Sequence, residues 1–361
     1  MTAPSPLFDF DDSSALIAAD IDGILRMSAL GGAQIRATAS AVDEQALDRL
    51  HDLHPRSVVL VGGDARSARA AELVVAMLAA HATVPLVVAP TTPTWVGPLD
   101  VVVVAGDDAG DPTLVESVAA GLQRRAEVVV GAPDEGPIRA AVAGRALLLP
   151  PRIHLPSAYA LARHVAVFCA VLTAMAATKV RSHVPDLAEL ADAVDNEAAR
   201  NHPSNEVFHN PAKSLAVRMY SRRVALAGDS PATTSLARHG AEMLLLGAGM
   251  IAAAASLPDT LAARDRLVAT TTGTGEPYDP FFHDEQLDGP IPEAPVRVFV
   301  LSTDDDRRAA QRRAAALPDM ELVSVVGETE SRAVPPVLEQ ALVLAARIEM
   351  AAAYLRLAGG R

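Results

Sequence analysis

The sequence has few of the residues that would tie it to an oxidising compartment, a nucleic acid or a membrane. Among 361 residues there is one cysteine, Cys169, so no disulfide can form within the chain, and we expect a reducing, cytoplasmic setting. Acidic residues outnumber basic ones by 44 to 31, which gives a formal charge of −13. That charge would repel a phosphate backbone or an anionic lipid surface, so we expect neither nucleic acid nor membrane as a partner.

Long apolar runs are also missing. The longest uncharged stretches, residues 165–178 and 243–258, fall short of the ~20 residues that a membrane span needs. The first twelve residues are acidic and contain no basic residue, unlike a secretory signal. Because nothing near Cys169 would stabilise a thiolate, we expect a buried, inert thiol there. Half of the residues are apolar, which is typical of a folded globular protein.

Short apolar runs that alternate with amphipathic stretches predict an α/β fold in two tandem, doubly wound domains, each a parallel sheet flanked by helices. The length favours a first domain at 1–152 and a second at 153–361. Continuous apolar runs indicate strands buried on both faces. The expected strands are 57–61, 84–88, 100–104, 127–130 and 145–149, then 222–227, 296–301 and 320–326. The expected helices are 12–30, 43–52, 65–80, 112–123, 135–142, 157–180, 185–199 and 335–358.

Two segments of the first half are similar in sequence to segments of the second half. Residues 58–64 (VVLVGGD) resemble 224–229 (VALAGD), and residues 101–108 (VVVVAGDD) resemble 298–305 (VFVLSTDD). An internal duplication explains this similarity, and chance convergence of strand–turn–helix units is the alternative. The loop at 270–295 is rich in glycine and proline and holds Tyr278, Phe281 and Phe282, so we expect it to cover a site or an interface.

Two loops contain groups that could carry chemistry. The turn Gly62-Gly63-Asp64 lies between a strand and a helix, where backbone N–H groups could hold an anion, or where it could be a tight structural turn. It matches neither the dinucleotide fingerprint nor the P-loop, and we expect no cofactor. The next loop offers Asp107, Asp108 and Asp111, which form either a solvated loop or a cation site. His202, Glu206 and His209 have the spacing of no zinc site, so we expect no metal there.

Two segments, 149–152 (LPPR) and 210–216 (NPAKSLA), are more specific than generic α/β sequence. Together with the glycine turn, the strand with an acidic tail at 298–308 and the helix end at 351–355 (AAAYL), they resemble the bifunctional phosphoglucose/phosphomannose isomerases. That family has paired sugar-isomerase (SIS) domains. The resemblance spreads over most of residues 20–358 and implies a homodimer that interconverts aldose and ketose 6-phosphates.

In that family, the hydroxyl and N–H groups of two loops hold the sugar phosphate. The resemblance therefore implies substrate-binding positions at Gly62, Gly63, Asp64 and Asp107, with Lys213 of the NPAKSLA segment as a further candidate. Asp64 stands where the family has a serine, and Asp107 lies in the loop where it has Ser-Gly-Asn-Thr. No hydroxyl remains at these places, so we expect the usual phosphate to bind poorly.

The family's catalytic groups are matched only in part. Its enediolate-stabilising arginine corresponds to Arg152, for which a structural ion pair is an equal alternative. The catalytic glutamate corresponds to Leu245 and the ring-opening histidine to Ala262, and neither residue can transfer a proton. Glu242 lies three residues before Leu245, on nearly the same helix face, and could supply a carboxylate with His239 as its partner. Alternatively, both are an exposed polar edge of the helix.

Three functional hypotheses remain open at this point. The first is a catalytically impaired SIS protein that binds a carbohydrate derivative or a protein partner, such as a paralogous active isomerase. The second is an active sugar 6-phosphate isomerase in which Glu242 is the base and Arg152 stabilises the enediolate. The third is nucleotide or metal-dependent chemistry at the acidic cluster of Asp107, Asp108 and Asp111. In each case we expect a homodimer and a small-molecule ligand.

Overall fold

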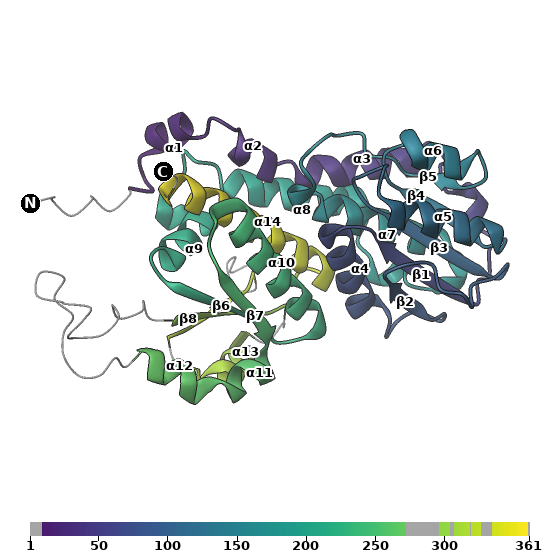
Figure 1. The fold of residues 1–361 in the computed structure, drawn as a ribbon. Coiled ribbons are helices and arrows are strands. Elements are labelled where there is room, and N and C mark those ends of the chain that lie inside the picture. The colour runs from purple at the N-terminus through teal and green to yellow at the C-terminus, as the bar shows by residue number, and fades with distance from the viewer. Residues whose placement is uncertain (1–8, 272–295, 304–306, 318, 326–333, 360–361) are drawn as a thin grey trace, which may run out of the picture.

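The computed structural model describes residues 9–271, 296–303, 307–317, 319–325 and 334–359 (Figure 1). Within these residues the chain forms two parallel β-sheets with helices between and around them. This confirms the predicted α/β class. The expected aromatic loop at 270–295 falls almost entirely outside the described residues, including Tyr278, Phe281 and Phe282.

The first sheet has the strand order β2-β1-β3-β4-β5, with every pair parallel. Valine runs form these strands because both faces are covered by helices. Val58 and Leu60 point into a core shared with α4 and α7, whereas Val59 and Val61 point toward α5 and α6. All five strands were predicted: β1 (Ser57–Gly62), β2 (Leu86–Ala89), β3 (Asp100–Ala105), β4 (Glu127–Gly131) and β5 (Leu147–Leu148).

The second sheet has the order β7-β6-β8-β9 and is also parallel throughout. Three of its strands were predicted: β6 (Arg223–Gly228), β8 (Val296–Leu301) and β9 (Met320–Val323). The apolar pattern does not reveal the edge strand β7 (Ala252–Ser256), because its four alanines have a low preference for strands. Its pairing with β6 is what makes it a strand.

The N-terminal helices differ from those expected. The single helix predicted over 12–30 is divided into α1 (Ser13–Ala19) and α2 (Ile24–Ser28). Asp20 causes the break, because its carboxylate accepts hydrogen bonds from the N–H groups of Ile24 and Leu25 and so caps a new helix. The helix predicted over 43–52 is wrong: α3 covers Gly31–Asp43, and one 3-10 turn follows at Asp48–Leu50.

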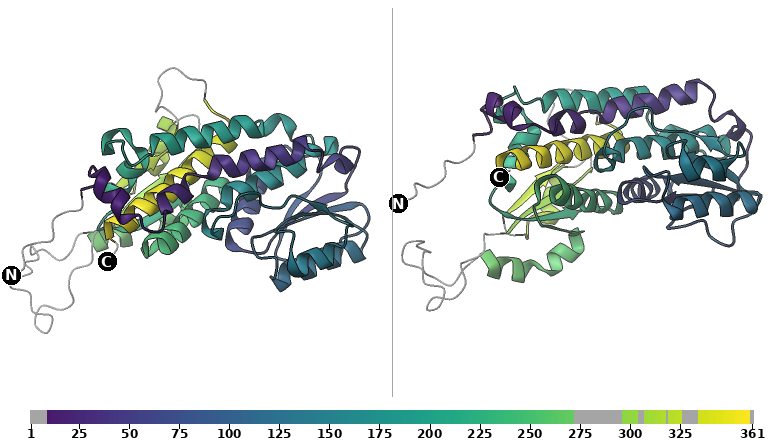
Figure 2. Two further views of the ribbon diagram at one scale, coloured as in Figure 1. Left: turned by 90° about the horizontal axis from the view of Figure 1, so that it is seen from above. Right: turned by 45° about the horizontal axis from the view of Figure 1, so that its top comes forward.

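A layer of helices joins the two sheets. The helix α4 packs against α10 of the second half, while α3 lies beside α7 and α8 (Figure 2). The C-terminal helix α14 contacts α8, α9 and α10. The remaining helices are α4 (Ala65–Leu78), α5 (Pro112–Gln123), α6 (Gly136–Val142), α7 (Leu161–Ala174), α8 (Leu187–Arg200), α9 (Pro211–Met219), α10 (Pro231–Ala248), α11 (Leu257–Ala262), α12 (Arg264–Thr271), α13 (Arg307–Ala314) and α14 (Val337–Gly359).

The helix α7 lies after the predicted domain boundary at Arg152, yet it packs against α4 and the first sheet. The boundary itself stays a prediction. Cys169 lies in α7 with no exposed surface, as expected, and burial raises the pKa of its thiol to about 12. None of the helices described here combines the length and hydrophobicity that crossing a bilayer requires.

The two sheets repeat one unit. In each, the first strand runs into a glycine and then into a helix whose N-terminus carries a capping box. A Cβ atom on Gly62 would lie 2.4 Å from the nitrogen of Ala68, and one on Gly228 would lie 2.1 Å from that of Thr234. Only glycine permits such close contact between strand and helix. The corresponding capping residue is a serine, Ser230, in the second unit. The geometry is in keeping with an internal duplication.

Candidate functional site

The candidate site is the region of Asp64 and Asp107 just beyond the ends of β1 and β3, which we call the crevice, at the point where the strand order of the first sheet reverses. Ligands of open α/β sheets bind at this kind of place. Asp64 is the N-cap of α4, and its Oδ1 accepts hydrogen bonds from the N–H groups of Arg66 (2.8 Å) and Ser67 (2.9 Å). The hydroxyl of Ser67 in turn accepts from the N–H of Asp64 at 3.1 Å. The helix N-terminus is therefore satisfied by a side chain of the protein.

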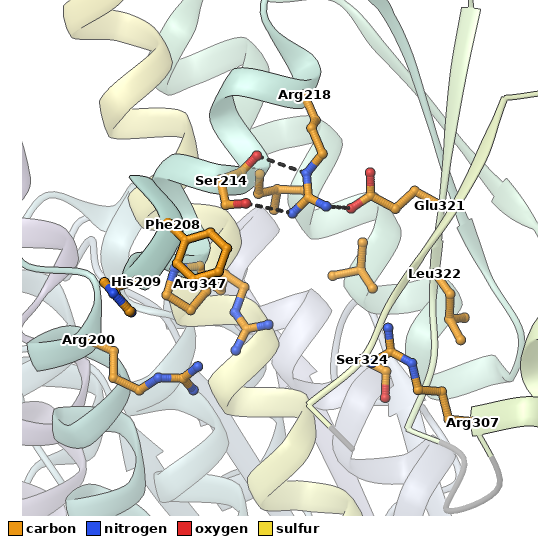
Figure 3. Close-up of a pocket in the computed structure, with 13 residues that line it drawn as sticks. Arg200, Phe208, His209, Ser214, Arg218, Arg307, Glu321, Leu322, Ser324 and Arg347 are labelled. Carbon is orange, nitrogen blue, oxygen red and sulfur yellow. Dashed lines mark hydrogen bonds and ion pairs between the residues drawn. The ribbon is translucent and has the colours of Figure 1, made fainter. Parts of the chain in front are cut away.

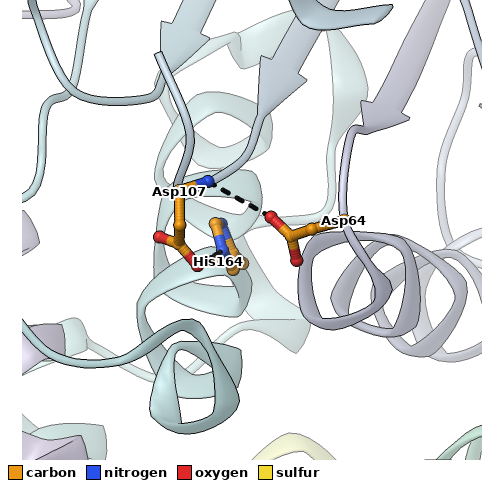
Figure 4. A group of neighbouring side chains, drawn as sticks. All are labelled: Asp64, Asp107 and His164. Atoms are coloured by element: carbon orange, nitrogen blue, oxygen red, sulfur yellow. Dashed lines mark hydrogen bonds and ion pairs between the residues drawn. The ribbon is translucent and has the colours of Figure 1, made fainter. Parts of the chain in front are cut away.

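The second oxygen of Asp64 joins the two loops of the crevice. Oδ2 accepts a hydrogen bond from the N–H of Asp107, which follows β3, at 3.2 Å (Figure 4). One carboxylate thus receives three backbone N–H donors, two from the first turn of α4 and one from the loop that follows β3. These are the kinds of donor that hold an anion at a helix N-terminus. The structure brings together the predicted positions Gly62, Gly63, Asp64 and Asp107. Of their N–H groups, that of Asp107 donates to the Asp64 side chain, whereas that of Gly63 donates to the carbonyl oxygen of Ala105.

Two residues of α7, Arg163 and His164, contact the carboxylate of Asp107. Its Oδ1 lies 2.6 Å from Nη2 of Arg163, and its Oδ2 lies 3.2 Å from Nε2 of His164. Arg163 also donates to the carbonyl oxygens of Gly106 and Gly131. Burial raises the pKa of the Asp107 carboxyl, but its hydrogen bonds to His164 and Arg163 outweigh that effect and leave the pKa below its ordinary value. Asp107 is therefore a charged carboxylate at neutral pH.

His164 has no exposed surface. Burial, followed by the charge of Arg163, lowers the pKa of its ring despite the opposite effect of Asp107. The ring is therefore neutral at neutral pH. Sequence patterns did not reveal Arg163 and His164, because both lie in a largely apolar helix that follows the predicted boundary. The only signal was two strongly polar residues at the start of that helix.

Oxygens of Asp64 and Asp107 and a ring nitrogen of His164 all lie within 4.8 Å of one another, close enough to hold a metal ion. Arg163, however, already supplies a positive charge 2.6 Å from Asp107. The arrangement therefore favours an internal ion pair over a metal centre. The other acidic residues have local roles: Asp108 accepts from the N–H of Gly110, and Asp111 caps α5.

Glu242 and His239 lie where α10 meets α4. Glu242 forms ion pairs with Arg66 and with Nε of Arg69, the latter at 3.0 Å. His239 is buried, with Nδ1 3.2 Å from Nη1 of Arg66 and Nε2 2.9 Å from Oε1 of Glu349. The two residues are therefore not an exposed polar edge. Arg66, which is buried, links them and follows the crevice residue Asp64 by two positions.

No protein-family model and no curated protein matches the sequence. Solved structures do match. A candidate phosphosugar isomerase from Clostridium difficile 630 superposes with a TM-score of 0.66 at 10% identity, with 93% of each chain covered. The C-terminal domain of glucosamine-fructose-6-phosphate aminotransferase from Francisella tularensis gives 0.58 at 11% identity, covering 95% of this chain and 96% of that one. This is the fold of the phosphosugar isomerases.

A third neighbour, tagatose-6-phosphate ketose/aldose isomerase from Escherichia coli, has a TM-score of 0.54 at 12% identity and covers 100% of this chain and 95% of its own. Identities this low establish the phosphosugar-isomerase fold and no activity. The fold agrees with the two SIS-like units expected from the sequence. The finer resemblance to the bifunctional phosphoglucose/phosphomannose isomerases stays a prediction.

The last two residues predicted for the site, Arg152 and Lys213, bind to other groups of the protein in this phosphosugar-isomerase fold. Arg152 forms an ion pair with Glu44, in which Nη1 and Oε1 are 2.7 Å apart. It lines a small recess together with Arg163. Lys213 is buried, and its Nζ donates to the carbonyl oxygens of Pro203 (2.7 Å) and Asn205 (2.9 Å). Burial lowers the pKa of Lys213. These contacts give Lys213 a structural role, in which it fixes the segment before α9.

Proposed function

We propose that this protein is a phosphosugar-isomerase-like SIS protein that is catalytically impaired and acts as a carbohydrate-derivative-binding or partner protein. One observation supports this above all others. The Asp64 carboxylate accepts hydrogen bonds from the backbone N–H groups of Arg66, Ser67 and Asp107, in the region where the resemblance puts a substrate phosphate. An active paralogous isomerase is one partner of the expected kind, and a homodimer is the proposed assembly.

Electrostatics opposes a sugar phosphate in this crevice. Two like unit charges 4 Å apart repel by about 4 kcal/mol at an effective dielectric constant of 20. A phosphate next to Asp64 would meet that repulsion and would also have to displace hydrogen bonds that are already made. The positive charge of Arg163, which could otherwise attract the phosphate, is paired with Asp107.

Among the described residues, the two positions that the resemblance assigns to proton transfer hold no base. Leu245 and Ala262 stand at the positions that the resemblance assigns to the glutamate and the histidine, and Leu245 is 55% exposed on α10. The nearby Glu242 has arginine donors on both of its oxygens. A general base must reach the substrate proton within hydrogen-bond distance, and removing such a base typically costs a factor of 10²–10⁴ in rate.

The proposal predicts no isomerisation by the purified chain. Fructose 6-phosphate is supplied, and formation of glucose 6-phosphate or mannose 6-phosphate is followed with time. We expect no turnover above the uncatalysed rate in the protein or in the variant Arg152→Ala. Turnover that falls in Arg152→Ala but persists in the control Arg145→Ala, an exposed arginine, would show an active isomerase and overturn the proposal.

The alternative is an active isomerase in which Glu242 is the base. Its position favours this reading, because Glu242 is only partly buried and contacts α4, which begins at the crevice. If the alternative holds, Glu242→Gln abolishes sugar-phosphate turnover. Glu72→Gln is the matched control, because Glu72 also pairs with Arg69 but belongs to α4 and not to α10. Unchanged turnover in Glu242→Gln would end this alternative.

A further inference from the structure

A small recess lies between α3 and the segment that follows β5. It is bounded by one face of α3, by residues 150–153 and by Arg163 of α7. Its volume is about 10 Å³, and one buried water molecule needs roughly 10–15 Å³ of such space. The recess is therefore the size of a single water molecule and is too small for a sugar or a phosphate.

One polar side chain that lines this recess has an atom without a protein partner. Gln34 of α3 is 2% exposed, and its Oε1 receives no hydrogen bond from any residue that the structure describes. A buried amide oxygen without a hydrogen bond is costly, so nearly all such groups in folded proteins bind either a protein donor or an ordered water. Gln34 therefore requires a donor that the described part of the chain does not provide.

The larger hollow beside β9, about 560 Å³ in volume, differs in this respect (Figure 3). There the guanidinium group of Arg218 donates to the carbonyl oxygen and hydroxyl of Ser214 and pairs with Glu321. A polar side chain that borders a cavity but already has protein partners does not call for a further molecule. The buried oxygen of Gln34 does.

Two neighbours of Gln34 supply further hydrogen-bonding groups to the recess. The hydroxyl of Thr38, one turn later on α3, donates to the carbonyl oxygen of Gln34 at 3.2 Å and can still accept a hydrogen bond. Arg163 makes its hydrogen bonds to described residues through Nη1 and Nη2, which leaves Nε as a donor. A buried water typically makes about three hydrogen bonds, and these three side chains provide both donors and acceptors for it.

The described lining of the recess carries no unbalanced charge. Its two arginines are both paired, Arg152 with Glu44 and Arg163 with Asp107. An ion would find no counter-charge there, whereas a neutral molecule that both donates and accepts matches the lining. Water also satisfies the Gln34 amide if its oxygen and nitrogen exchange places, because water can accept from the NH₂ group as well as donate to the oxygen.

We propose that this recess is a buried water site, in which one ordered water molecule donates a hydrogen bond to Oε1 of Gln34 and is held by Thr38 and Arg163. The water links α3 to the arginine that pairs with Asp107, so the polar contacts of the crevice extend through α7 to α3. The site does not depend on the function proposed above, because it requires no ligand in the crevice.

The first test is a high-resolution crystal structure of the full chain. We expect one ordered water peak in the recess, within hydrogen-bond distance of the Gln34 amide. The same water should be detected in solution by NMR, as a cross-peak between water and the Gln34 side-chain amide protons with the sign of a slowly exchanging, bound molecule. A recess without a water peak, a Gln34 amide that bonds directly to a protein group, or the absence of the cross-peak would each overturn the proposal.

The second test removes the acceptor. Gln34→Leu keeps a side chain of similar volume but offers the water no hydrogen bond, so we expect its crystal structure to lose the water peak. The matched control is Gln123→Leu, which changes an exposed glutamine at the end of α5 and should keep the peak. A peak that persists in Gln34→Leu would show that Gln34 does not hold the water. If Gln34→Leu fails to fold, the first test still decides. Neither test measures isomerisation, so the two proposals fail separately.

Discussion

Replacing Asp107 by serine is expected to destabilise the fold by about 3 kcal/mol in phosphate-free buffer. The variant restores a hydroxyl at this loop but removes the partner of Arg163, whose side chain is 5% exposed. Breaking a buried ion pair on one side leaves an uncompensated charge, which typically costs 3–5 kcal/mol. The free energy of unfolding is measured by urea titration, followed by circular dichroism.

Inorganic phosphate should restore part of the lost stability of Asp107→Ser, because an anion in the crevice can neutralise Arg163 as Asp107 did. A ligand at 100 times its dissociation constant adds about 2.7 kcal/mol. The matched control is Asp108→Ser. Among the described residues, the Asp108 side chain accepts a hydrogen bond from the N–H of Gly110 alone, so its loss should change little. If Asp107→Ser and Asp108→Ser have equal free energies of unfolding, with and without phosphate, the Asp107–Arg163 pair does not stabilise the fold and both predictions fail.

The difference in unfolding free energy between the protein and Asp107→Ser should depend on pH, because the pKa of Asp107 is lowered in the folded state. A carboxyl with a depressed folded-state pKa stabilises the fold fully above its unfolded-state pKa and loses that effect as the pH falls through the folded-state value. The stability difference between the protein and Asp107→Ser should therefore be constant from neutral pH to about pH 5 and shrink in more acidic solution.

The sequence predicts most of the scaffold because its strands are buried on both faces. Such strands must be apolar along their whole length, and runs like that of Val101 to Val104 leave little ambiguity. The wrong or missed elements result from local polar contacts and from pairing with a neighbouring strand. Asp20 divides a helix by capping a new one, and β7 is a strand only because β6 pairs with it. Neither effect is visible in an apolar pattern.

The crevice could be predicted in part. Asp64 and Asp107 follow neighbouring parallel strands, so their meeting at one edge of the sheet is a consequence of topology. Arg163 and His164 could not be predicted, because they reach the crevice from a helix about 55 residues later in the chain and no spacing rule connects them. The contacts of Arg66 with Glu242 and His239 depend on the packing of α4 against α10. This is tertiary structure, which the sequence pattern does not show.

Replacing Glu197 by alanine should destabilise the fold by about 3–5 kcal/mol, the range for removal of one partner from a buried ion pair. Glu197 on α8 is 1% exposed and holds Arg347 of α14, whose side chain is 5% exposed, through both carboxylate oxygens. It also accepts from Nδ2 of Asn201 at 2.9 Å. Without Glu197 the Arg347 charge stays buried while the α8–α14 contact loses its polar link. Urea titration in phosphate-free buffer measures the change.

The matched control for Glu197→Ala is Asp195→Ala on the same helix. Asp195 pairs with Arg36 at 2.8 Å, but the two side chains are 39% and 46% exposed, and exposed pairs contribute at most about 1 kcal/mol. The double variant Glu197→Leu/Arg347→Met should recover most of the stability, because it removes both charges and keeps apolar volume. Equal stabilities of Glu197→Ala and Asp195→Ala would contradict the prediction.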